Sequence, residues 1–417
     1  MSVKFKLTAM SFLQFFVWGA WLITFGNYWF GTKGWSGTEF GVIFSTMGIA
    51  SLFMPTLTGI IADRWINAEK LYGILHILGG ITLLVVPTIT TPGDFFWIIL
   101  IAMIFYMPTI ALSNSISYNA LKNNNLDVVK SFPPIRVWGT FGFIVAMWMT
   151  NLTGNKASAN QFVIAGVFAI VLGIYAFFLP KCPPQSVTKE EESWVKMLGL
   201  DAFRLFKNYK MAMFFIFSML LGAALQLTNA YGDTFLDEFK HIAEFKESIV
   251  VKYSTQFMSI SQFSEMLFIL AIPFFLKRFG IKKVMLISML AWVLRFALFA
   301  YGDPGAGLWM IILSGIVYGM AFDFFNISGS LFVETETDAS IRNSAQGLFM
   351  MMTNGFGAIL GSLVSGILID KYFTSDVGRD WNGIWLTFAA YAFVVAIFFA
   401  VLFRHKHNPD EIGDVSH

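Results

Sequence analysis

Long apolar segments, each about as long as a membrane-crossing helix, limit what this sequence can fold into. A helix needs roughly 20 apolar residues to cross the ~30 Å hydrocarbon core of a bilayer. Hydrophobic residues make up 56% of the chain and charged residues only 13%, against about a quarter charged in a soluble protein. We therefore expect an all-α membrane protein. Twelve segments predict transmembrane helices: 8–30, 38–62, 71–91, 95–119, 134–152, 161–179, 211–234, 253–276, 281–301, 307–330, 342–369 and 382–403.

The longest polar connection divides these segments into six and six. It reads "LPKCPPQSVTKEEESWVKMLGLDAFRLFKNYK", in which prolines stop a helix and an acidic patch is too polar for lipid. We predict an N-terminal six-helix half at 1–180, a connector at 181–210, and a C-terminal half with a short tail at 211–417.

Lysines and arginines predict the orientation in the membrane. An even number of segments places both termini on one side, and most basic residues between segments fall on that side, including Lys277, Arg278, Lys282 and Lys283. Cytoplasmic loops carry such an excess, so we expect both termini and the connector in the cytoplasm. The first apolar run is too long for a signal peptide and lacks a small-residue cleavage site, which predicts a retained first span.

Composition and motifs exclude several function classes. The net charge of +2 is too small to suggest a nucleic-acid partner, and the single cysteine, Cys182, excludes an intrachain disulfide or a cysteine metal cluster. The glycines of "NGFGAILGSLVSG" lie inside an apolar segment without a preceding strand, so they predict a helix-packing face made by Gly357, Gly361 and Ser365. Because no catalytic motif is present, we expect neither an enzyme nor a bound metal.

Two segments of the C-terminal half carry pairs of polar residues one helical turn apart. Gln262 and Glu265 stand in "SISQFSEMLFILA", and Gln226 and Asn229 stand in "LQLTN". An ionisable residue at the centre of a span costs about 2.5 to 3.5 kcal/mol, so it needs an explanation. One explanation is that these residues form hydrogen bonds between helices. We favour a second explanation, in which they form a polar wall that binds a ligand.

A third segment, "YGMAFDFFNISGS", places Tyr318, Phe322 and Asp323 over one broad helical face. The Asp323 side chain is too short to reach the membrane surface from this depth. Asp323 either joins helices through a hydrogen bond, or it carries a proton or contacts a ligand.

A fourth segment, "FPPIRVWGTFGFI", places Arg136, Thr140 and Phe143 on a single stripe. Arg136 lies near the cytoplasmic end, so its side chain either extends to the membrane surface or contributes with the stripe to a cavity.

Four other polar residues stay ambiguous. Arg295 lies about two turns from the outer end of its segment, and we expect it to extend to the membrane surface. His76 suits helix packing as well as function, and Asn114 and Tyr118 fit either packing or an extended polar lining.

The combination of aromatic rings, amides and carboxyl groups suits a neutral, flat solute that bears hydroxyl groups. Rings stack on a base, amides pair with its edges, and carboxylates or hydroxyls bind a ribose. An oligosaccharide would also satisfy these groups, and the residue chemistry alone leaves both substrates open.

Two equivalent loops carry a resemblance to a known superfamily. They read "GIIADRWINAEK" and "IPFFLKRFGIKK", and each lies after the second segment of its half. Together with the six-plus-six arrangement they resemble the major facilitator superfamily, whose loop motif is matched by Gly59, Asp63 and Arg64 but not by Ile66 and Asn67. The resemblance implies two halves that move about a central site.

Longer blocks resemble the bacterial nucleoside:proton symporter family within that superfamily. They include "FPPIRVWGTFGFI", "LLGAALQLTNAYGDTFL", "YGMAFDFFNISGS" and "AQGLFMMMTNGFG", and the similarity runs from residue 5 to residue 407. The resemblance places the family's substrate contacts on Arg136, Thr140, Phe143, Gln226, Asn229, Gln262, Glu265, Tyr318, Phe322 and Asp323.

This resemblance implies proton-coupled import of nucleosides, such as uridine and adenosine, across the bacterial cytoplasmic membrane. The proton gradient would drive transport without a cofactor, and we expect a monomer. Glu265 and Asp323 are the candidate proton carriers. Our hypothesis is that Asp323 carries the proton, because phenylalanines flank it, whereas Glu265 chiefly binds the substrate. The alternatives are a proton-coupled sugar symporter and a transporter-like receptor without flux.

Overall fold

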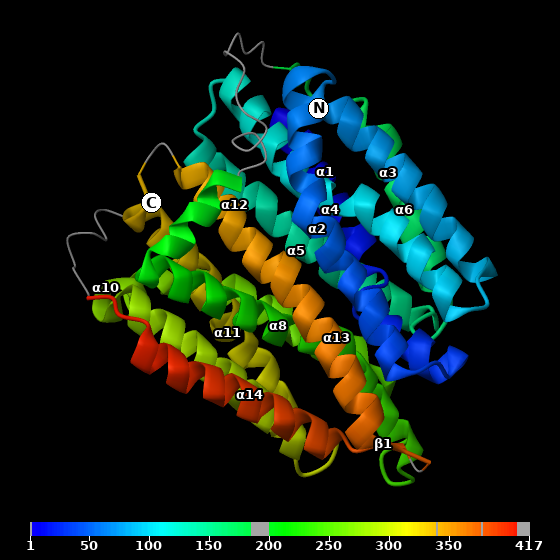
Figure 1. Cartoon of the computed structure of the whole chain (residues 1–417). Coiled ribbons are helices and arrows are strands. Elements are labelled where there is room, and N and C mark those ends of the chain that lie inside the picture. The colour runs from blue at the N-terminus through cyan, green and yellow to red at the C-terminus, as the bar shows by residue number, and fades with distance from the viewer. Residues whose placement is uncertain (1, 185–199, 339–340, 377, 407–417) are drawn as a thin grey trace. The chain divides into compact units, whose positions relative to one another are not determined.

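The computed structural model describes residues 2–184, 200–338, 341–376 and 378–406 (Figure 1). Residues 185–199 of the predicted connector and residues 407–417 of the predicted tail lie outside the described residues. Within the described part, the regular elements are helices, except for a short antiparallel hairpin formed by β1 (Thr374–Ser375) and β2 (Gly378–Arg379). This confirms the prediction of an all-α fold.

The chain divides into two compact units. In the first unit, α1 packs against α5 and α6, and α3 packs against α4 and α6. Its elements are α1 (Val3–Gly19), η1 (Asn27–Lys33), α2 (Gly37–Arg64), α3 (Ala68–Val85), η2 (Val86–Thr88), α4 (Pro92–Asn123), α5 (Val128–Leu152) and α6 (Asn160–Ala176).

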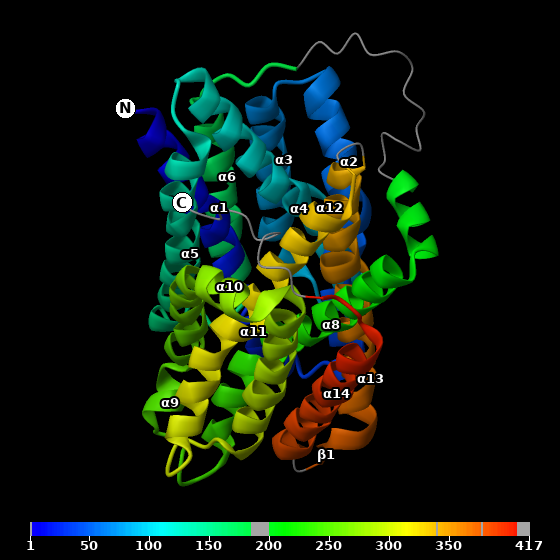
Figure 2. The same ribbon diagram turned by 90° about the vertical axis from the view of Figure 1, so that its left-hand side faces the viewer.

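In the second unit, α10 packs along α11 and α14, and α8 packs against η5 and α13 (Figure 2). Its elements are η3 (Leu200–Lys207), α8 (Tyr209–Glu238), η4 (Phe239–His241), α9 (Ile249–Lys252), α10 (Ser254–Tyr301), α11 (Leu308–Glu336), α12 (Arg342–Met350), η5 (Met351–Gly357), α13 (Ala358–Leu368), η6 (Ile369–Phe373) and α14 (Trp381–Leu402).

The segment Ser36–Gly41, which contains the start of α2, groups with the second unit. There the Asp370 carboxylate accepts hydrogen bonds from the backbone N–H groups of Gly37 and Thr38, each at 2.6 Å. An acidic group at this position satisfies the otherwise unpaired N–H groups at a helix start and interacts favourably with the helix dipole.

Helix α10 covers two predicted segments, 253–276 and 281–301, and is interrupted between them. Gly280 has φ 77° and ψ 167°, a conformation outside the helical region. A side chain at positive φ would clash with the backbone, so a glycine is favoured at this break. The glycine of "KRFGIKK" therefore separates two helices.

The first predicted segment, 8–30, is not one continuous helix. Helix α1 ends at Gly19, turns follow, and the π-helix η1 begins at Asn27. The Thr150 hydroxyl donates to the carbonyl oxygen of Ala20 at 2.8 Å, and the Thr24 hydroxyl bonds the Gln161 side chain at 2.9 Å. Side chains from other helices thus provide hydrogen bonds for groups in the irregular stretch, which apolar patterning does not reveal.

The small residues of the penultimate predicted segment pack helices closely, as expected. A Cβ atom on Gly361 would lie 2.6 Å from the carbonyl oxygen of Ala223, and one on Gly357 would lie 2.5 Å from that of Met219. Because both partners are backbone atoms of α8, only glycine fits at these positions. The predicted packing face is confirmed.

Within the described part of the chain, eight helices are long and apolar enough to cross a membrane. Helix α10 counts once in this number although it holds two predicted segments, and the apolar helix α6 is shorter. The total of twelve spans and the side of the termini remain predictions.

Candidate substrate-binding site

Seven of the ten predicted site residues lie in the second unit. Gln226 and Asn229 are on α8, Gln262 and Glu265 on the first part of α10, and the remaining three, Tyr318, Phe322 and Asp323, on α11. Contacts between α10 and α11 and between α8 and α10 bring these three helices together. The structure thus places the three helices that carry these residues side by side in one unit.

Two aromatic rings form a flat surface on α11. Tyr318 and Phe322 stack with ring centroids 5.8 Å apart and an interplanar angle of 7°. Trp292 approaches Tyr318 edge to face, with centroids 5.8 Å apart. Because Tyr318 is only 5% exposed, its ring has little freedom to rotate. The pair offers a rigid apolar face next to polar groups.

The two candidate acids lie near each other and near this aromatic pair. Glu265 is close enough to interact electrostatically with Asp323, and both interact with Tyr318. Asp323 is 4% exposed, and its Oδ2 has no hydrogen-bond partner among the described residues. The neighbouring rings of Phe324 and Phe325 are also buried, so Asp323 lies in the dry setting that the sequence suggested.

Amides from two more positions line a hollow together with Phe322, and the sequence patterns did not predict them. A hollow of about 270 Å³, including space open to solvent, is lined by Phe322, Trp292, Asn326 and Asn354, among others. Asn354 belongs to η5, and π-helical turns inside longer helices are frequent at functional sites. The signal that the sequence carries for both positions is a single asparagine inside an apolar segment.

Three predicted site residues lie in the first unit, all on α5. The Arg136 guanidinium lies over the Phe15 ring of α1, with Cζ 4.0 Å from the ring centroid. Phe143 is 8% exposed, and its carbonyl oxygen lies against Gly19. Contacts with α1 therefore hold the two ends of the predicted stripe, with Thr140 between them.

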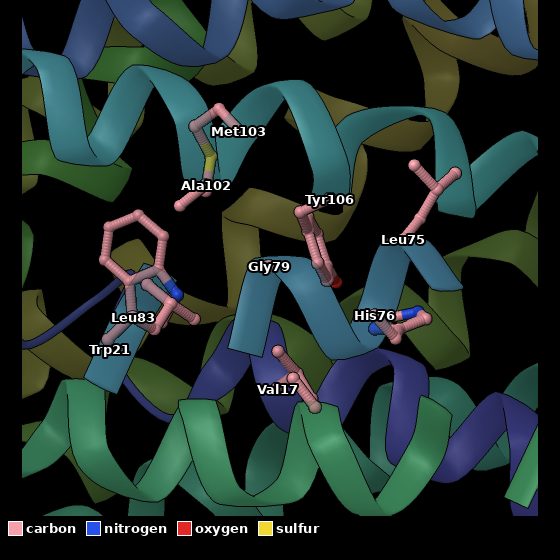
Figure 3. Close-up of a pocket in the computed structure, with 10 residues that line it drawn as sticks. Val17, Trp21, Leu75, His76, Gly79, Leu83, Ala102, Met103 and Tyr106 are labelled. Carbon is pink, nitrogen blue, oxygen red and sulfur yellow. The ribbon is translucent and has the colours of Figure 1, made fainter. Parts of the chain in front are cut away.

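His76 is part of a hydrogen-bond network inside the first unit. The Tyr72 hydroxyl donates to Gln14 Oε1 at 2.6 Å, and His76 Nε2 lies 2.9 Å from the same oxygen. The Gln14 amide donates to Thr109 Oγ1 at 2.9 Å. His76 is thus a hydrogen-bonded interior residue, and Figure 3 shows it at an apolar pocket that Tyr106 also lines.

The expectation that Arg295 reaches the membrane surface is wrong. Arg295 is 1% exposed and donates from Nη1 to the Ser314 carbonyl oxygen at 2.6 Å. Hydrogen bonds from its Nη1 hold the guanidinium inside the unit instead of at the membrane surface. Tyr118 is 39% exposed, and its ring packs edge to face on Phe132, so its role stays a prediction.

The sequence as a whole matches known transporters. The model of the family described as "Nucleoside H+ symporter" matches residues 1–408. The chain belongs to this family. With its apolar helices, it is a multi-pass membrane protein.

Individual relatives support this family assignment. The chain is 52% identical to the nucleoside permease NupG of Escherichia coli over 100% of both chains. It is also 52% identical to the xanthosine permease of the same organism, over 99% of this chain and 98% of that one. The family and both relatives are transporters, which confirms the expectation that the chain is not an enzyme.

A solved structure from the same family has the same fold. The crystal structure of nucleoside transporter NupG (D323A mutant) superimposes with a TM-score of 0.93 at 51% identity, covering 97% of this chain and 100% of that one. The fold is therefore of the major facilitator type.

Proposed function

We propose that the chain imports nucleosides together with protons across the bacterial cytoplasmic membrane by alternating access. The substrate would bind in a central cavity between two six-helix halves, with both termini and the connector in the cytoplasm. Family membership supports this proposal, and one observation in the second unit carries it: a stacked aromatic pair lies beside two neighbouring acids, the buried Asp323 and the half-buried Glu265.

The aromatic pair suits the base of a nucleoside. Stacking of a base on an aromatic side chain contributes about 1 to 3 kcal/mol, which a flat base uses better than a puckered sugar ring. The amides of Gln226, Asn229 and Gln262 offer donors and acceptors for the polar edges of the base. Gln262 Oε1 is buried without a hydrogen-bond partner among the described residues, so it is available to accept one from a ligand.

The first unit would complete the binding site. On α5, Arg136 and Thr140 offer donors for the ribose hydroxyls, and Phe143 offers a second ring. These roles rest on the resemblance of the ten residues to the family's substrate contacts.

The acid pair suits proton coupling. Two neighbouring carboxylates repel each other, and a proton on either one removes that repulsion. Asp323 would carry the coupling proton and Glu265 would chiefly bind the nucleoside. One proton moving through ~100 mV supplies roughly 2.3 kcal/mol, enough for ~50-fold accumulation of the solute. The proton gradient alone would drive transport, without a cofactor, and the chain would work as a monomer.

Uptake by the purified full chain in proteoliposomes tests the proposal. We expect uridine, adenosine and guanosine to accumulate only with a proton gradient that is acidic outside, and unlabelled nucleosides to compete with labelled uridine. Competition by sugars but not nucleosides would indicate a sugar symporter. Binding of uridine without any uptake would indicate a receptor.

A further inference from the structure

Arg295 is a buried cation that contacts Tyr318 of the aromatic pair, and neither the family's substrate contacts nor the proton pathway proposed above includes it. It lies in the second part of α10 and is 1% exposed. Its Nη1 donates to the Ser314 carbonyl oxygen at 2.6 Å and to Ser261 Oγ at 3.2 Å. The Ser314 hydroxyl in turn donates to the Arg295 carbonyl oxygen at 3.2 Å. Arg295 therefore joins both parts of α10 to α11.

Two aromatic rings complete the surroundings of the guanidinium. Its Cζ lies 4.6 Å from the centroid of the Tyr318 ring and 5.0 Å from that of Phe299. Within the described part of the chain, no carboxylate forms an ion pair with Arg295, and its Nε lacks a hydrogen-bond partner. A buried cation is costly unless its charge is compensated. Ring faces attract cations more strongly when water is absent, so Tyr318 stabilises this charge.

The same contact restrains Tyr318. Arg295 contacts its ring, Trp292 packs against it edge to face, and Phe322 stacks on it at an angle of 7°. If the ring moved away, the buried guanidinium would lose one of its few favourable contacts. The orientation of the Tyr318–Phe322 pair is therefore coupled to a charge that lies outside the set of predicted substrate contacts.

We propose that Arg295 is a positioning residue for substrate binding, which holds Tyr318 and through it the Tyr318–Phe322 pair in the orientation that receives a flat base. Arg295 sets the affinity for nucleosides without contacting them. This inference rests on the proposed function, in which the aromatic pair binds the nucleoside.

The test compares uridine binding to the purified full chain, measured calorimetrically, for wild type and Arg295→Met. Loss of the guanidinium frees the Tyr318 ring, so we expect the dissociation constant to rise about tenfold. The maximal rate of counterflow should change much less than KM. Arg295→Lys keeps the charge but lacks the planar group, and it provides a variant for the case that Arg295→Met does not fold. We expect an intermediate affinity for it.

A double-mutant cycle separates positioning from a general structural effect. Tyr318→Leu weakens binding directly, and adding Arg295→Met should weaken it no further, because Arg295 acts through that ring. Phe299→Leu is the matched control: it removes the other ring beside Arg295, and we expect it to leave uridine affinity within about twofold of wild type.

The outcomes are distinct. Additive losses in the cycle, or wild-type affinity in both Arg295→Met and Arg295→Lys, would overturn the inference while the proposed function stands. Absence of nucleoside binding by the wild-type chain would overturn the proposed function itself.

Discussion

Tyr318 and Phe322 lie one helical turn apart on α11, and their rings stack with a centroid distance of 5.8 Å and an interplanar angle of 7°. The spacing i, i+4 places both side chains on one face of a helix, so the sequence alone brings them together. Their common orientation depends on the tertiary structure. Trp292 packs against the Tyr318 ring edge to face, and the Arg295 guanidinium lies over the same ring.

Phe322→Ala should weaken nucleoside binding. Removal of the ring deletes a stacking surface that contributes about 1 to 3 kcal/mol, so the dissociation constant for uridine should rise about 5- to 150-fold. Calorimetry on the purified protein measures the effect. Phe324→Leu is the control, because that ring packs against Phe275 in the interior, with centroids 4.8 Å apart. Equal losses for both variants would argue against a specific role of Phe322.

Asp323→Asn should separate binding from coupling. The amide cannot take up and release a proton, so accumulation of uridine against a gradient should disappear, whereas counterflow, which needs no net proton movement, should persist. Proteoliposome assays measure accumulation and counterflow of uridine, and alkalinisation of the medium measures proton movement. Normal accumulation with normal alkalinisation by Asp323→Asn would show that another group carries the proton.

Glu265→Gln provides the comparison for that experiment. If Glu265 chiefly binds the nucleoside, the variant should raise KM for uridine and keep proton-dependent accumulation at saturating substrate. Loss of one charged hydrogen-bond acceptor corresponds to about 1.5 to 3 kcal/mol, or roughly a 10- to 150-fold change in KM. Loss of accumulation with an unchanged KM would assign the proton to Glu265 instead.

Cys182, the single cysteine, should react slowly with thiol reagents in the folded protein. Burial raises the pKa of its thiol to about 11, and the nearby Glu69 carboxylate contributes to the shift. Only the thiolate reacts, so labelling near neutral pH should be about two orders of magnitude slower than for a free thiol and should accelerate as the pH rises. Maleimide labelling from pH 7 to pH 9 measures this dependence.

Two comparisons complete the labelling experiment. Glu69→Gln removes a negative charge beside the thiol, so the pKa should fall and labelling should accelerate at constant pH. Denaturation in detergent should abolish the difference between the variants. Equal rates for the folded and denatured wild-type protein would show that the thiol is accessible.

Gly280→Ala should destabilise the second unit. At φ 77° and ψ 167°, a region adopted essentially only by glycine, a Cβ atom adds strain of about 1 to 3 kcal/mol. A thermal unfolding assay in detergent should show a lower midpoint than for Gly93→Ala, a substitution near the start of α4 with open space around it. An unchanged midpoint for Gly280→Ala would mean that the break between the two helices adjusts without cost.

The sequence by itself determined the helical architecture and the chemical character of the site. Apolar runs long enough to cross a bilayer leave the backbone only intrahelical hydrogen bonds, so the helices follow from composition and length. Polar residues inside those runs are costly, and for that reason the acids, amides and rings of α8, α10 and α11 are conspicuous in the sequence alone.

Only the tertiary structure decided which partners certain polar side chains bond to. A long side chain such as Arg295 can extend along its own helix or turn into the bundle, and the choice depends on Ser314 and Tyr318 of another helix. His76 likewise finds its partner in Gln14, and the break after Gly19 is accompanied by a hydrogen bond from Thr150 to Ala20. Such partners are distant in sequence and become neighbours only when the helices pack, so local patterns carry no trace of them.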